Sequence, residues 1–136
     1  MQMNYKTLFA ILIMFLLTNL VYSQDSLQVV PRITDEDIEI NYLKGTESEN
    51  LGLKISAAYY LGERKSQKAV IPLMDALRTD SSPEVRIMAA LSLYKIGDER
   101  GIFAIKKAIE FDDNQQVKQM CGIFYQMHIA EKKQTE

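Results

Sequence analysis

Apolar residues recur at intervals of three and four along most of the chain after residue 50, which is the spacing of amphipathic helices. Between residues 85 and 109 the pattern divides into two such stretches. Gly97 and Asp98 stand between them, where they can end the first helix and cap the second. The pattern therefore predicts two helices joined by a tight turn.

The sequence pattern of this helix pair repeats along the chain. At an offset of 32 residues, Leu53 falls on Val85 and the small pair Ala57-Ala58 falls on Ala89-Ala90. A third, partial copy carries Cys121-Gly122 at the position of the small pair. Self-similarity at a fixed period marks a repeat architecture, and small side chains suit helices that cross about 8–10 Å apart. We therefore predict an all-α fold, a short right-handed α-solenoid of about two and a half stacked antiparallel helix pairs.

Polar residues predict where the helices begin. Ser82 is expected to cap the first helix of the second copy, and Asp98 its second helix. Ser66 is expected to take the capping role of Asp98 in the first copy. Thr34 precedes a run of acids and begins a predicted helix over residues 35–44. This helix would stand in the place of the second helix of a truncated preceding repeat.

The segment VRIMAALSLYKIGDERGIFAIKKAI, residues 85–109, resembles the HEAT-like repeats of the bilin-lyase type. The unit of that family has a Val-Arg start, a small pair, a leucine, then Gly-Asp and Arg before a second apolar helix. The first copy departs from this unit at Arg64-Lys65-Ser66, and the third copy stops after its first helix. The resemblance covers about residues 53–127 and implies an α-solenoid. It does not carry the lyase activity over, because one fold serves many functions.

The first 23 residues differ from the rest of the chain. Lys6 is their only charge, and residues 8–17 are an unbroken apolar run. A basic start, an apolar run and a small residue at Ser23 follow the order of a secretory signal peptide. We expect cleavage near Ser23 and a secreted or periplasmic mature protein. The alternative is a membrane anchor over residues 8–21, although an apolar helix of this run spans only about 15 Å against about 30 Å of bilayer core.

The rest of the chain divides into three predicted segments. Residues 24–33 are expected to be extended, because Pro31 disfavours a helix. Residues 34–131 form the predicted repeat domain, and residues 132–136 form a polar tail.

The composition offers few groups for chemistry. The chain has 136 residues, a net charge of −2, one His, one Cys and no Trp. Its interspersed charges give no basic block for nucleic acid, and a single His with a single Cys excludes the paired ligand motifs of zinc sites. Cys121 is expected to be a buried small residue, and His128 a solvated capping residue near the end of the last helix, where a positive charge is favoured. We therefore expect no catalytic residues, no metal site and no cofactor.

Apolar residues also stand where helices of this kind are usually polar. Ile71 and Phe103 hold equivalent positions in the second helices of the two copies. The first helices carry another set, here named the outer stripe: Ile55, Tyr59, Ile87, Leu91 and Ile123. Two interpretations stay open. Either the N-terminal segment SLQVVP or a neighbouring helix covers these positions, or one of the sets is exposed and binds a partner.

The favoured hypothesis is a non-enzymatic scaffold module that binds a protein or peptide on the face of its second helices. The predicted contact residues are Ile71, Met74, Asp75, Phe103, Lys106 and Lys107. The outer stripe is the alternative binding face. Two other functions are considered: a HEAT-like lyase or small enzyme accessory, and a structural protein that self-associates through its open end at residues 123–127. No nucleic acid partner is expected, and membrane contact is expected only through an uncleaved signal segment.

Overall fold

A computed structural model describes residues 4, 6, 13–15 and 32–135 of the chain. Residues 33–136 form a compact unit, and residues 1–32 form a separate one. The predicted signal peptide and the predicted extended segment, including SLQVVP, fall almost entirely outside the described residues. In the part of the chain that is described, no helix is both long enough and apolar enough to cross a membrane.

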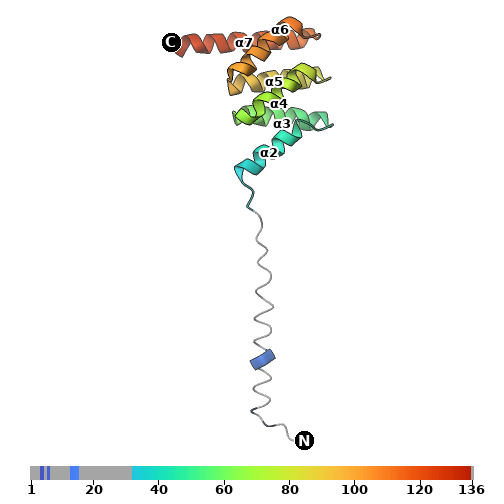
Figure 1. The fold of residues 1–136 in the computed structure, drawn as a ribbon, viewed down its shortest axis with the longest axis vertical. Helices are drawn as coiled ribbons and strands as arrows, with labels where there is room; N and C mark the ends of the chain where they lie inside the picture. Colours follow the sequence, from blue (N-terminus) through green and yellow to red (C-terminus); the bar gives the residue numbers. More distant parts are fainter. Residues whose placement is uncertain (1–3, 5, 7–12, 16–31, 136) are drawn as a thin grey trace. The chain divides into compact units, whose positions relative to one another are not determined.

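The compact unit consists of helices stacked in chain order (Figure 1). Their bounds are α2 Asp35–Gly45, α3 Leu51–Glu63, the short 3-10 helix η1 Gln67–Ala69, α4 Val70–Thr79, α5 Pro83–Ile96, α6 Glu99–Phe111 and α7 Gln115–Thr135. The first repeat comprises α3, η1 and α4, and the second comprises α5 and α6. The described residues contain no strand, and the predicted all-α solenoid is confirmed.

The helices form two layers around one apolar core. In one layer α5 packs between α3 and α7, and in the other α4 packs on α6. Each second helix also packs on the first helix of the next repeat, so α4 lies on α5 and α6 on α7. The core between the layers holds the fully buried side chains Leu61, Leu73, Leu93 and Ile105. Helix α2 packs on α3 in the way that α4 packs on α5, which is the place predicted for it.

The first repeat is less covered than the second because, among the described residues, only α2 precedes it. Leu53, Val85 and Val117 hold equivalent positions at the start of α3, α5 and α7. Val85 and Val117 are buried, whereas Leu53 is half exposed. The array of described residues is therefore open at its N-terminal end.

The small residues of the first helices allow close crossings, as predicted, but not in the last copy. Ala58 and Ala90 are buried, and the Ser92 hydroxyl donates to the Ala58 carbonyl oxygen at 2.7 Å. Gly122 is the equivalent residue of α7, and a Cβ added to it would meet nothing within 4 Å. The predicted demand for a small side chain at Gly122 is therefore wrong, because no further described helix packs on this face of α7.

Most helix starts follow the predicted side chains. The Thr34 hydroxyl accepts from the Asp37 amide at 3.1 Å, and the Asp37 carboxylate accepts from the Thr34 amide at 2.9 Å. The Ser82 hydroxyl accepts from the amide of Val85, and the Asp98 carboxylate accepts from the amide of Arg100 at 2.9 Å. The predicted capping role of Ser66 is wrong. Its hydroxyl donates to the Glu39 carboxylate of α2 instead, and no side-chain cap begins η1.

The turns between first and second helices contain a residue with positive φ at the same position in both repeats. Gly97 ends α5 with φ 75°, in the left-handed region that favours glycine. Its equivalent in the first repeat is Lys65, which has φ 50°. The left-handed residue is therefore kept in the first repeat even though lysine stands in place of glycine.

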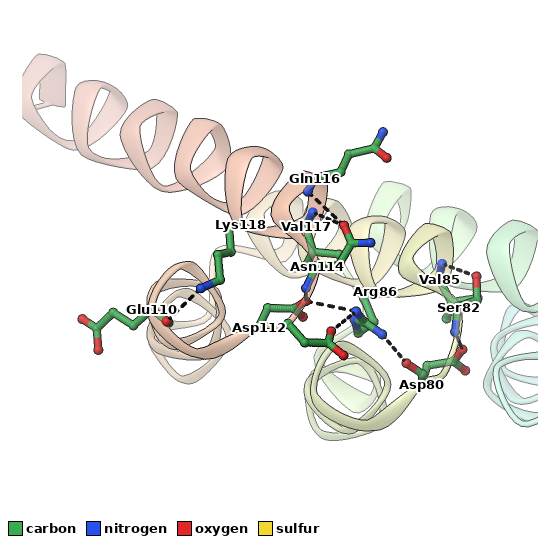
Figure 2. Close-up of polar contacts among 11 residues, drawn as sticks. Asp80, Ser82, Val85, Arg86, Glu110, Asp112, Asn114, Gln116, Val117 and Lys118 are labelled. Atoms are coloured by element: carbon green, nitrogen blue, oxygen red, sulfur yellow. Dashed lines mark hydrogen bonds and ion pairs between the residues drawn. The ribbon is translucent and has the colours of Figure 1, made fainter.

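An ion pair joins the start of each first helix to the turn that follows its second helix. In the first repeat Lys54 Nζ lies 2.6 Å from the Asp80 carboxylate. In the second, Arg86 lies 3.0 Å from the Asp112 carboxylate (Figure 2). Arg86 also donates to the carbonyl oxygen of Asp80 at 2.8 Å, which connects the two repeats.

Helix α7 is longer than the sequence pattern predicted. It continues to Thr135, so residues 132–135 belong to the helix, in the segment where a polar tail was expected. His128 consequently lies inside the helix rather than near its end, and its predicted capping position is wrong. Lys132 and Lys133 occupy the last turn, where a positive charge favours the helix terminus.

Candidate functional site

A groove of about 470 Å³ lies between the second helices α4 and α6. Its volume falls within the range of about 300–1,000 Å³ that is typical of ligand pockets. The residues that line it are Ile71, Met74, Asp75, Leu77 and Arg78 from α4, and Phe103, Ala104, Lys107, Ala108, Phe111 and Asp112 from α6 and its end. We call this feature the α4–α6 groove.

The two helices turn one face inward and leave the other free. On α4 the buried residues are Val70, Leu73 and Leu77, at intervals of three and four. Ile71 lies outside this buried stripe and is 58% exposed. On α6, Phe103 and Phe111 are 59% and 75% exposed. Three large apolar side chains thus stand in solvent around one groove, and exposed apolar clusters of this kind mark interaction sites.

Charged side chains border the apolar residues. Lys107 Nζ lies 5.7 Å from the ring centre of Phe103 and 5.2 Å from that of Phe111. The same ammonium forms an exposed ion pair with Glu110 at 3.3 Å. Cations held over aromatic rings gain about 0.5–1 kcal/mol at exposed sites. Lys107 is thus positioned between two aromatic rings of the groove.

The other charges of the groove already have partners. Arg78 and Asp75 form an exposed pair on α4 at 2.9 Å. The Asp112 carboxylate is nearly buried and is bound by Arg86 (Figure 2). Asp112 consequently belongs to the support of the groove rather than to its accessible surface.

The structure brings five of the six predicted contact residues into this groove. Ile71, Met74, Asp75, Phe103 and Lys107 line it, and Lys106 does not. The residues that the sequence pattern missed are Leu77, Arg78, Ala104, Ala108, Phe111 and Asp112. Phe111 is the most exposed of the groove's large apolar residues. The sequence signal for it was an aromatic residue at the polar end of a predicted helix, directly after Glu110.

The outer stripe is not one continuous exposed surface. Ile87 and Leu91, in its middle, are partly buried and pack against the core. Tyr59 is more exposed, but its ring lies 5.0 Å from Lys95 Nζ and 5.5 Å from the ring of Tyr60. Ile123 on α7 is half exposed. Since its central members are partly covered, the stripe offers less free apolar surface than the α4–α6 groove.

The thiol of the single cysteine, Cys121, has low reactivity in this environment. Cys121 is buried in the core. Burial, together with the negative charge of Asp112, raises the pKa of its thiol to about 12. The thiolate is the reactive form of cysteine, so Cys121 is a poor nucleophile and metal ligand at neutral pH.

The comparison with known families agrees with the stacked helix pairs. The family of HEAT repeats matches residues 41–122, which is more than half of the chain. The chain belongs to the HEAT-repeat family. No match was found among curated proteins.

Proposed function

We propose that this protein is an exported, non-enzymatic module that binds a protein or peptide in the α4–α6 groove. HEAT repeats support a protein-interaction or scaffold role in general. The observation that carries the more specific proposal is the exposure of Ile71, Phe103 and Phe111 around one groove. Large apolar side chains at the centre of an interface supply most of its binding energy.

The chemistry of the groove supports the proposal of a non-enzymatic role. The charged groups of the groove already have partners: Asp75 pairs with Arg78, Asp112 with Arg86, and Lys107 with Glu110. Cys121 is buried in the core, and neither it nor His128 lines the groove. A catalytic acid or base must be free to act on a bound substrate, whereas the carboxylates and the lysine of the groove are engaged in ion pairs. The groove has the features of a docking surface instead.

Two glutamate substitutions test whether the groove is a free binding surface. Phe103→Glu and Ile71→Glu should change the free energy of unfolding by no more than about 0.5 kcal/mol, as at ordinary surface sites. Ile105→Glu is the matched control, because Ile105 is fully buried on the same helix as Phe103. It should unfold the protein by burying an unpaired charge. Thermal melts of the three variants measure this difference, and collapse of both groove variants would show that their side chains are core residues.

Capture of partners from the exported fraction tests the binding itself. The unmodified protein should retain a partner. Phe103→Glu and Ile71→Glu should each weaken the free energy of binding to that partner by about 2 kcal/mol or more. Ile123→Glu, in the outer stripe, is the control and should leave binding of the partner unchanged. If the Ile123 variant loses the partner and the groove variants keep it, the binding face is the outer stripe and the proposal fails.

Export rests on the charge and apolar pattern of the first 23 residues. Mass spectrometry of the protein from the producing cell should show a mature start at or close to Gln24. A full-length chain retained in the membrane fraction would favour the anchor over residues 8–21 and would reject this part of the proposal.

A further inference from the structure

We infer that the α4–α6 groove selects a peptide with an acidic side chain next to its apolar anchors. This inference rests on the proposed function and specifies the chemistry of the partner. It starts from the position of Lys107, whose ammonium lies between the rings of Phe103 and Phe111. Both rings line the groove, as does Lys107 itself. A peptide that packs on the two rings must therefore also cover the ammonium.

The lysine differs from the other charged groups of the groove in where its partner lies. Asp75 and Arg78 both line the groove and pair with each other across 2.9 Å. Asp112 is paired with Arg86 behind the groove wall. Lys107 pairs with Glu110, which is exposed and does not line the groove. Of the two cations that line the groove, Arg78 pairs with a carboxylate of the lining, whereas Lys107 pairs with a carboxylate outside it.

Covering the lysine changes the energies of its interactions. A charge taken out of water is costly unless a partner of opposite charge replaces the lost hydration. The attraction between a cation and an aromatic ring becomes stronger when water is excluded, but the rings supply no hydrogen-bond acceptor for the ammonium. A carboxylate on the peptide would supply this acceptor and form a charge-assisted hydrogen bond. With a neutral peptide bound, Glu110 would be the only carboxylate that pairs with the Lys107 ammonium. A basic peptide would add repulsion between its own positive charge and this ammonium.

Matched synthetic peptides test this inference directly. The first set combines Phe, Leu and Ile anchors with Glu at varied spacings, and the second and third sets replace each Glu by Gln or by Lys. Binding of each peptide to the full chain is measured by fluorescence anisotropy. The best Glu peptides should bind at least about tenfold more tightly than their Gln counterparts, which is the size of one good charge-assisted hydrogen bond. The Lys peptides should bind most weakly.

Two neighbouring lysines separate a specific contact from general attraction of charge. Lys107→Gln should reduce the preference for Glu over Gln to about one. Lys106→Gln removes the same charge from the next residue of α6, which does not line the groove, and should keep most of the preference. Both lysines are exposed, and thermal melts should confirm that both variants are folded. Equal losses in the two variants would show long-range attraction only and would overturn the inference.

The remaining outcomes distinguish this inference from the proposed function. If Glu and Gln peptides bind equally and Phe103→Glu abolishes both, the groove binds peptides but the acidic preference is wrong. If no peptide responds to Phe103→Glu, both the preference and the proposed binding site fail. Binding of vesicles of anionic phospholipid that depends on Phe103, without peptide binding, would replace the peptide by a membrane surface. A dimer that Phe103→Glu dissociates in light scattering would replace it by a second copy of the chain.

Discussion

Arg86 and Asp112 form an ion pair that closes the second helix pair of the solenoid. The guanidinium at the start of α5 lies 3.0 Å from the carboxylate that follows α6 (Figure 2). The side chain of Asp112 is only 6% exposed, and that of Arg86 only 9%. Asp113 contacts the same guanidinium at 2.7 Å, but its side chain is 91% exposed. The two carboxylates bind the same cation and differ mainly in their access to water.

This difference predicts unequal effects of removing the two carboxylates. In the unmodified protein the Asn114 amide donates to the Asp112 carboxylate. Asp112→Asn keeps an oxygen that can accept this hydrogen bond, but it removes the negative charge opposite Arg86. We expect a loss of about 2 kcal/mol in the free energy of unfolding, because a nearly buried guanidinium loses its buried partner. Asp113→Asn should cost less than about 1 kcal/mol, as for an exposed ion pair. Urea unfolding measures both variants. Similar losses would mean that burial does not set the strength of this ion pair.

The second prediction concerns three equivalent small residues of the first helices. Ala58→Leu and Ala90→Leu should each destabilise the fold by about 1–3 kcal/mol, because both sites are closed by the next repeat. Gly122→Ala should instead stabilise it by up to about 1 kcal/mol. The added methyl group meets nothing within 4 Å, and alanine favours a helix over glycine. Thermal melts test the series, and a destabilised Gly122→Ala variant would show that a further segment covers α7.

Much of the fold could be predicted because its determinants are local or repeated. The caps at Thr34, Ser82 and Asp98 bind amides two or three residues away, so the chain segment alone predicts them. Ser66 could not be predicted in this way. Its hydroxyl binds Glu39, which is distant in sequence and lies on another helix. This bond holds the pKa of Glu39 below its ordinary value.

The groove was predicted less completely because equivalent residues of adjacent helices face different neighbours. Met74 and Lys106 hold the same position in the two repeats, yet only Met74 lines the groove. The groove takes the side of α4 that faces α6 and the side of α6 that faces α4, and these are different sides of the repeat unit. Phe111 was missed for a related reason. Its equivalent in the first repeat is Thr79, so comparison of the two copies gave no apolar match there.

The left-handed turn residue gives a third prediction. Lys65 holds φ 50° where the second repeat has Gly97. A side chain in this conformation costs about 1–2 kcal/mol. Glycine removes this cost, but the greater freedom of glycine in the unfolded chain cancels part of the gain. Lys65→Gly should therefore stabilise the protein by about 0.5–1 kcal/mol, and Gly97→Ala should destabilise it by about 1 kcal/mol. Opposite signs in chemical denaturation are the expected result. A destabilised Lys65→Gly variant would indicate that the lysine side chain makes a contact that outweighs its backbone strain.

The last prediction concerns the dependence of stability on acid. Burial alone would raise the pKa of Asp80, but hydrogen bonds from Lys54 and the Ser82 amide, with the charges of Lys54 and Arg86, outweigh it and hold the pKa below its ordinary value. A carboxylate whose pKa is lower in the folded state stabilises the fold above its unfolded pKa, and this contribution is lost as the pH falls through the folded pKa. Asp80→Asn should therefore be less stable than the unmodified protein by about 1–2 kcal/mol near neutral pH.

The difference between the two proteins should start to shrink as the pH falls below about 4, near the pKa of an unfolded aspartate, and should vanish once the pH passes the lower folded pKa of Asp80. Other carboxylates titrate in both proteins and cancel in the comparison. Urea unfolding of the pair at a series of pH values measures this difference. Lys54→Gln should shift its disappearance to higher pH, since it removes the hydrogen bond and charge that lower the pKa of Asp80. A stability difference that stays constant through the acid range would show that Asp80 acts through its hydrogen bonds alone and not through its charge.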